Sequence, residues 1–173
     1  MAGFEPALNK RLQELWGTPP NLYRGLGNHP ALVAAWTEFS KMLRHDTRTP
    51  RALRELVILR GAQVVQSEYE WAQHLRMARK AGVREAQITA LASWKNSNEF
   101  DAKEKAALAI AEDVTNGGVS DETYKLAMQH FDHHDYVEIA AVAAFYAMVG
   151  RMLDAMHVQL EPGFRDYSPK LPK

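Results

Sequence analysis

The sequence predicts an all-α protein, and three observations support this class. Apolar residues recur at helical spacing in most segments, while prolines, capping residues and glycines mark where these segments begin and end. No segment alternates apolar and polar residues over the length of a strand, so we expect no sheet. With 173 residues, 46% of them hydrophobic, the chain can bury one core, which favours a single domain of about eight helices.

The first half of the chain is expected to form four helices. Prolines suit the first turn of three of them, and Ser67 with Glu70 forms a capping box at the start of the fourth. Residues 21–28, which follow a Thr-Pro-Pro break, are expected to form a compact, turn-rich segment. The four expected helices cover residues 6–17, 30–45, 49–66 and 67–82.

The second half is expected to form four more helices. The first covers residues 83–94 and is followed by a loop. Capping residues precede the other three, at Asp101, at Ser120 and at either Asp132 or Asp135. These three helices are expected to cover residues 101–116, 120–131 and 132–158.

Three prolines beyond Glu161 predict an extended C-terminal tail. We therefore expect three parts in the chain. They are an N-terminal helical extension, a helical domain and a Pro-containing tail, over residues 1–20, 21–160 and 161–173.

Two of the expected helices are apolar on nearly every face, over residues 53–65 and 137–149. A surface helix of a small monomer would expose part of such a face to water. Each must therefore be surrounded, either by other helices of the chain or by another subunit. So much apolar helix favours a homo-oligomer.

The composition bears on the partners and the compartment. Lys and Arg together number 21, as do Asp and Glu, so the chain lacks the basic excess typical of nucleic-acid binders. The N-terminus has no apolar signal run, and the longest nearly uncharged stretch, 139–150, is shorter than the ~20 residues that span a bilayer. We therefore expect no nucleic-acid or membrane partner and a cytoplasmic protein. The absence of cysteine excludes disulfides, thiol peroxidase chemistry and iron–sulfur clusters.

The best candidates for chemistry lie between Glu55 and His74. Ser67, Glu70 and His74 share one helical stripe, with Trp71 beside it. A histidine with a carboxylate one turn earlier is suited to proton transfer, because imidazole titrates near neutrality and the carboxylate orients it. Burial in an apolar helix can raise the pKa of Glu55.

Each candidate also has a structural interpretation. The capping box accounts for Ser67 and Glu70, and a histidine on a half-buried stripe is often a hydrogen-bonded core residue. Glu55 has Arg51 one turn earlier, so an ordinary ion pair is possible. These alternatives stay open at the level of sequence.

Metal sites are a weaker interpretation, and we expect neither a metal nor a cofactor. The run HFDHHD over residues 130–135 has the composition of a metal site, but Asp132 and Asp135 also fit helix capping. Glu55, Glu70 and His74 would supply only three ligands. Arg151, the one cation near the buried part of the last helix, suits a clamp for a substrate carboxylate or an ion pair with Asp154.

Several of these residues resemble a known family. The segments RELVIL (54–59), YEWAQH (69–74) and FYAMVGR (145–151) are similar to the carboxymuconolactone decarboxylase family. The resemblance covers roughly residues 21–162. In a sister group, alkylhydroperoxidase D, a Glu is followed after eleven residues by Cys-x-x-Cys-x-x-x-His. This chain has Glu55 and His74 in that frame, but Ser67 and Glu70 replace the two cysteines, so thiol peroxidase activity is not expected.

The resemblance implies a cofactor-free enzyme assembled as a trimer or hexamer. In the namesake reaction a small lactone acid loses carbon dioxide, which implies catalytic roles for His74, Glu70 and Glu55. The residues implied to contact the substrate are Ser67, Tyr69, Trp71 and Arg151. The alternatives are a non-catalytic oligomeric helical protein that retains the family core, and a metal-dependent enzyme. A catalyst should place His74 on a water-accessible cavity in contact with a carboxylate, whereas a structural role should pack it inside.

Overall fold

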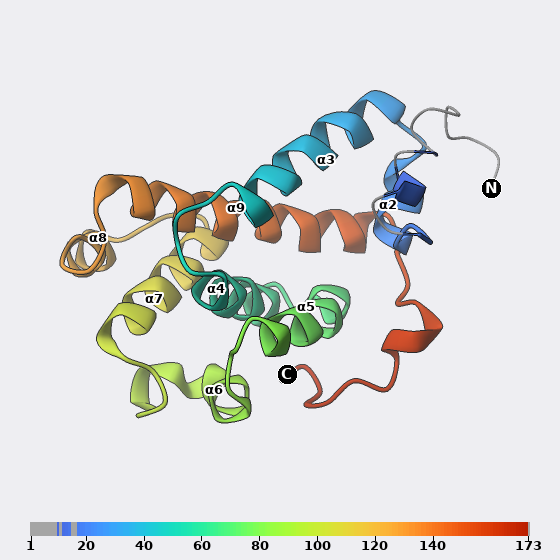
Figure 1. Ribbon diagram of the computed structural model, residues 1–173. Coiled ribbons are helices and arrows are strands. Elements are labelled where there is room, and N and C mark those ends of the chain that lie inside the picture. The colour runs from blue at the N-terminus through green and yellow to red at the C-terminus, as the bar shows by residue number, and fades with distance from the viewer. Residues whose placement is uncertain (1–9, 11, 15–16, 173) are drawn as a thin grey trace.

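The structure is a computed structural model that describes residue 10, residues 12–14 and residues 17–172. These residues form helices and no strand, which confirms the all-α prediction (Figure 1). Most of the helix expected over residues 6–17 lies outside the described residues. The described α-helices and two 3₁₀ turns (η) are α2 Asn21–Leu26, α3 Pro30–His45, α4 Arg51–Val64, α5 Glu68–Lys80, α6 Glu85–Ala90, η1 Leu91–Asn96, α7 Ala102–Asn116, α8 Asp121–Met128, α9 His133–Ala155 and η2 Pro162–Phe164.

The predicted capping residues begin the helices. The side chains of Ser67, Asp101 and Ser120 accept hydrogen bonds from backbone N–H groups in the first turns of α5, α7 and α8. Asp132 rather than Asp135 caps α9, because its carboxylate accepts the Asp135 N–H at 2.9 Å. Helix boundaries that depend on a local side-chain cap were therefore predictable.

Two elements differ from the expectation. The segment expected to be turn-rich contains α2, whose first N–H is accepted by the Glu161 carboxylate at 2.6 Å. A residue 140 positions away thus replaces the local cap. The helix expected over residues 83–94 is instead α6 followed by a 3₁₀ turn, and Ser93 leaves helical geometry with φ −115°.

Helix α4 is the central element and packs against α5, α7 and α9 (Figure 1). One set of its side chains, including Val57 and Ile58, joins the core formed with α3, α7 and α9. The opposite set, including Leu56 and Leu59, joins a second core beneath α5, α6 and η1. The helices of the same chain therefore account for the all-round apolar character of α4.

Helix α9 is long and apolar enough to cross a membrane by length and composition alone. It packs against α4 and α7, and its buried residues include Ile139, Val142 and Tyr146. Half of its most apolar 18-residue window is buried inside the chain. Val137 and Met148 leave the core and are 62% and 41% exposed.

The C-terminal tail runs along α5 (Figure 1). The Tyr167 hydroxyl donates to Glu68 at 2.6 Å, and the Trp71 indole N–H donates to the Pro169 carbonyl at 2.9 Å. Further along, Gln66 donates to the Pro172 carbonyl at 3.1 Å. Apart from the turn at Pro162–Phe164 the tail lacks regular structure, as its prolines predicted.

Candidate active site

Helices α4 and α5 pack against each other and carry the candidate site residues. Ser67 is the N-cap of helix α5, and its Oγ accepts the Glu70 N–H at 3.4 Å. The position of this cap determines which way the side chains of the following turns point. Glu70 and His74 are one turn apart and share the face that looks toward α4 and α9. Glu55 comes from the middle of α4 and is completely buried.

The Glu55 carboxylate holds one side of the His74 ring. Its Oε2 lies 2.8 Å from His74 Nδ1, while its Oε1 pairs with Arg51 one turn earlier on α4. Burial alone would raise the pKa of Glu55, but the attraction of His74 and Arg51 exceeds that effect and lowers it. An ionised Glu55 accepts a hydrogen bond from the Nδ1–H of His74. Nε2 is then the ring nitrogen that can exchange a proton with a ligand.

Glu70 lies on the other side of the ring. Its Oε2 is 3.7 Å from His74 Nε2, which is too long for a hydrogen bond. Burial and the neighbouring Glu55 raise the pKa of Glu70 to about 7, against the opposing attraction of His74. Glu70 Oε2 has no hydrogen-bond partner among the described residues. The site therefore holds a buried carboxyl that can exchange a proton near neutral pH, with an imidazole beside it.

These two side chains line a cavity of about 840 Å³. Its apolar wall comes from α3 and α9 and includes Trp36, Phe145 and Val149. Tyr146 also lines it, with its ring edge-on to His74 at a centroid distance of 4.8 Å. A mostly apolar cavity of this size with a few polar groups is typical of a small-molecule site.

The Glu161 carboxylate lines the same cavity and is hydrogen-bonded to α2 and α5. Its carboxylate accepts hydrogen bonds from the Tyr69 hydroxyl at 2.7 Å, Gln73 Nε2 at 2.7 Å and the Asn21 N–H at 2.6 Å. The wall thus depends on α2 and the tail as well as on α5. Sequence reasoning missed Glu161 because its partners are far away in the chain.

Most ionised groups around the cavity are cationic. Among the described lining residues, Arg24, Arg44, Arg76 and Lys80 are basic, while Glu70 and Glu161 are acidic. Burial raises the pKa of Glu70, Glu161 is held by three donors, and the basic side chains outnumber the acidic ones, so the cavity favours an anionic ligand.

The structure places the other predicted site residues apart from His74. Arg151 lines a second cavity of about 570 Å³ and donates to the Thr115 carbonyl at 2.9 Å. It follows Tyr146 by five residues, about 140° around the helix, so α9 turns it away from the His74 cavity. In the single chain Arg151 therefore lies outside the cavity that His74 lines, and its expected role as a carboxylate clamp stays a prediction.

Ser67, Tyr69 and Trp71 have different surroundings. Ser67 caps α5 and lines the second cavity, and Tyr69 lines both cavities. Trp71 is fully buried in the second core. Of these three, only Tyr69 shares the cavity of His74, and its hydroxyl is already bonded to Glu161.

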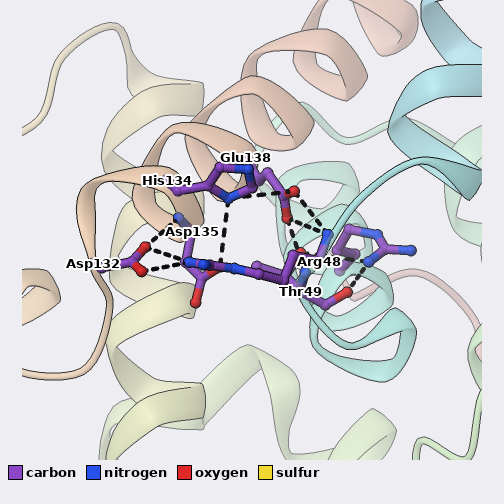
Figure 2. A network of polar contacts seen from close by, with 7 residues as sticks. Arg48, Thr49, Asp132, His134, Asp135 and Glu138 are labelled. Atoms are coloured by element: carbon purple, nitrogen blue, oxygen red, sulfur yellow. Dashed lines mark hydrogen bonds and ion pairs between the residues drawn. The ribbon is translucent and has the colours of Figure 1, made fainter.

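The acidic and histidine-rich run at the start of α9 forms an ionic network (Figure 2). Asp132, His134 and Asp135 present ligand atoms close enough together for a metal ion. Arg48 occupies this cluster, with ion pairs of 2.5 Å to Asp132 and 2.8 Å to Asp135. Glu138 accepts the backbone N–H of Arg48 at 2.8 Å, so the cluster docks the loop before α4 onto α9.

Comparison with known proteins shows which sequences and folds this chain is similar to. Residues 30–113 match the sequence model of the Carboxymuconolactone decarboxylase family. The uncharacterized protein YdfG of Bacillus subtilis (strain 168) is 32% identical over 95 residues. That match covers 53% of this chain and 65% of YdfG, which is less than two thirds of the relative.

Solved structures share the fold over nearly the whole chain. The debrominase Bmp8 superposes with a TM-score of 0.80 at 21% identity, covering 92% of this chain and 89% of that one. An uncharacterized peroxidase-related protein from Silicibacter sp. TM1040 gives a TM-score of 0.83 at 17% identity, covering 96% and 91%. One from Ralstonia eutropha JMP134, described as an alkylhydroperoxidase AhpD core, gives 0.79 at 20%, covering 93% and 88%.

At these identities the structural matches establish the fold alone, which is an AhpD-like helical fold. Over residues 30–113 the sequence is similar to the Carboxymuconolactone decarboxylase family.

Proposed function

We propose that the protein is a cofactor-free lyase or isomerase that acts on a small carboxylated ring or lactone by proton transfer. The observation that carries this proposal is the position of His74. Its Nδ1 is held by Glu55 at 2.8 Å, and it lines the 840 Å³ cavity together with Glu70. A base oriented by a carboxylate and open to a ligand cavity is the arrangement that general acid–base catalysis requires.

The charges of the site provide one mobile proton. Arg51 balances Glu55, and Glu55 fixes the Nδ1 proton of His74. The exchangeable proton is therefore shared between Glu70 and His74 Nε2 on the cavity side. Because the pKa of Glu70 is about 7, the pair can donate or accept a proton at neutral pH.

A decarboxylation would use this proton directly. The bond between the ring carbon and its carboxylate breaks, carbon dioxide leaves, and the electron pair moves into a conjugated carbonyl to form a dienolate. Glu70 then protonates the ring carbon and regains its proton from water through His74. The substrate carboxylate would be held by the basic groups Arg44, Arg76 and Lys80, which take the role expected of Arg151.

A small cyclic ligand is consistent with the ligand bound by one structural neighbour. A cysteine-to-alanine variant of the debrominase Bmp8, which is 21% identical to this chain, has been solved with 2,3,4-tribromopyrrole. That ligand is a small ring, as is the substrate class proposed here. Since this chain has no cysteine, we propose no thiol-dependent reaction for it.

The two alternatives explain the geometry less well. His74 is only 4% exposed, but it lines the cavity beside Glu70, and a purely structural histidine needs no cavity at its ring. A metal site at this position needs three or more ligands, but both Glu55 oxygens already serve Arg51 and His74. Only His74 Nε2 and Glu70 then remain available.

The test is release of carbon dioxide from a panel of lactone and aromatic acids. His74→Gln keeps a hydrogen-bonding side chain that cannot titrate near neutrality, and it should reduce turnover by ~10²–10⁴-fold. His133→Gln, on the exposed first turn of α9, serves as the control and should keep full activity. A folded and fully active His74→Gln variant would show that the mechanism is wrong.

We also propose that the protein acts in the cytoplasm as a homo-oligomer, either a trimer or a hexamer. Its support is the apolar surface that the single chain leaves exposed on α3 and α9, including Phe39 at 44% and Val137 at 62%. No nucleic-acid or membrane partner belongs to this proposal.

A further inference from the structure

Tyr146 is a polar side chain of the cavity wall that the proposed reaction leaves unused. It lies on α9, and its ring meets His74 edge-on at 4.8 Å and an interplanar angle of 83°. On its other side it contacts Phe145 at 5.3 Å, and Phe145 in turn packs against Trp36 at 5.1 Å. The ring is thus fixed by aromatic neighbours, and its position relative to His74 is fixed with it.

The hydroxyl of Tyr146 is free to bind a ligand. Among the described residues none hydrogen-bonds to it, although the side chain is only 8% exposed and lines the cavity. A hydroxyl in a mostly apolar cavity gains free energy from a hydrogen-bond acceptor that enters with a ligand. Burial raises the pKa of Tyr146 well above its usual range, so the hydroxyl keeps its proton and acts as a donor.

Tyr69, the neighbouring tyrosine of the same cavity, shows the contrast. Its hydroxyl donates to Glu161 at 2.7 Å and accepts the Leu22 N–H at 3.4 Å. The only proton that this hydroxyl can donate is therefore already used within the chain. Tyr69 supports the wall, while Tyr146 offers an unused donor beside the proton-transfer pair.

We propose that Tyr146 is a further catalytic residue, whose hydroxyl donates a hydrogen bond to the ligand oxygen on which negative charge develops. This inference rests on the proposed function and deepens it. The ligand class is then a ring that carries a carbonyl conjugated to the reacting carbon, such as an unsaturated lactone.

The division of roles follows from the chemistry of the step. When the carboxylate leaves as carbon dioxide, the electron pair of the broken bond reaches the carbonyl oxygen, and Tyr146 binds that oxygen without giving up its proton. The ring carbon takes its proton from Glu70. A donor placed at a developing oxyanion in a water-poor cavity is commonly a large contribution to catalysis.

The test uses 4-nitrophenolate, a ring with an anionic oxygen whose absorbance changes on hydrogen bonding, and nitrobenzene, which lacks that oxygen. Tyr146→Phe removes one oxygen and keeps every ring contact. It should weaken binding of 4-nitrophenolate by about 10-fold or more, which is the range for a hydrogen bond to a charged group. Binding of nitrobenzene should stay unchanged. Tyr69→Phe is the matched control and should not lower 4-nitrophenolate affinity by a comparable factor.

Two results would overturn the inference: unchanged 4-nitrophenolate affinity in a folded Tyr146→Phe variant, or no 4-nitrophenolate binding by the wild-type protein. If Tyr146→Phe does not fold, 3-fluorotyrosine at position 146 keeps the hydroxyl and makes it a stronger donor. Affinity must then rise, and an unchanged value also overturns the inference. The proposed function is tested separately, because turnover of His74→Gln does not depend on 4-nitrophenolate affinity.

Discussion

Replacing Glu70 by glutamine is expected to stabilise the protein at pH 8 and to change its stability little at pH 4. The pKa of Glu70 is about 7 in the folded chain, above its ordinary value of 4.5. Below pH 4.5 the carboxyl is protonated in both the folded and the unfolded state. Between these two values the unfolded chain releases the proton while the folded chain retains it, so stability falls as pH rises.

The size of this effect follows from the shift in pKa. A difference of about 2.5 pKa units at 1.36 kcal/mol each gives about 3 kcal/mol of lost stability above pH 7. Glutamine has a similar shape and no charge, so Glu70→Gln should recover up to that amount at pH 8.

Urea unfolding of both proteins at pH 4 and pH 8 measures this difference directly. Glu122→Gln, at an exposed position in the first turn of α8, is the control and should change stability little at either pH. An equal stability difference between Glu70→Gln and wild type at the two pH values would refute the reasoning. It would mean that Glu70 ionises normally in the folded protein.

Two further predictions concern packing and assembly. Gly150→Ala should destabilise the protein by about 1–3 kcal/mol, because a Cβ there would lie 2.8 Å from Val65 Cγ2 and 3.3 Å from Ser67 Cβ. Thermal unfolding measures this effect, and an unchanged Tm would contradict the prediction. Sedimentation at micromolar concentration should show an oligomer, and Phe39→Glu on the exposed face of α3 should weaken the association between subunits. A stable wild-type species near the chain mass of 19.5 kDa would disprove the oligomer.

Local signals made much of the fold predictable from the sequence. The capping side chains of Ser67, Asp101 and Ser120 act within four residues, so each helix start is encoded where it occurs. The helix at residues 21–26 was missed because its first N–H is bound by Glu161, and no local pattern encodes that contact. The 3₁₀ turn after α6 was missed for a similar reason, since apolar spacing does not separate one long helix from two short ones.

The site was predictable where helical periodicity controls it. One turn of helix puts Glu70 beside His74, and the apolar surroundings of Glu55 indicated that it would be buried. Tyr146 and Glu161 were not predicted as site residues, because α9 and the tail reach the cavity only through tertiary packing. Arg151 was expected to suit a carboxylate clamp because it is the one cation near the buried part of the last helix, and the rotation of α9 places it at the second cavity.

The identity of residue 70 explains how this chain can differ in chemistry from the sister group it resembles. In the frame of that group the position belongs to the second cysteine, one turn before the histidine. A carboxyl placed there keeps the helical geometry toward His74 but cannot form a disulfide or reduce a peroxide. Burial raises the pKa of this carboxyl to about 7, so it can give up or take a proton near neutral pH. Under the proposed function this carboxyl delivers a proton to carbon, which is acid–base rather than redox chemistry.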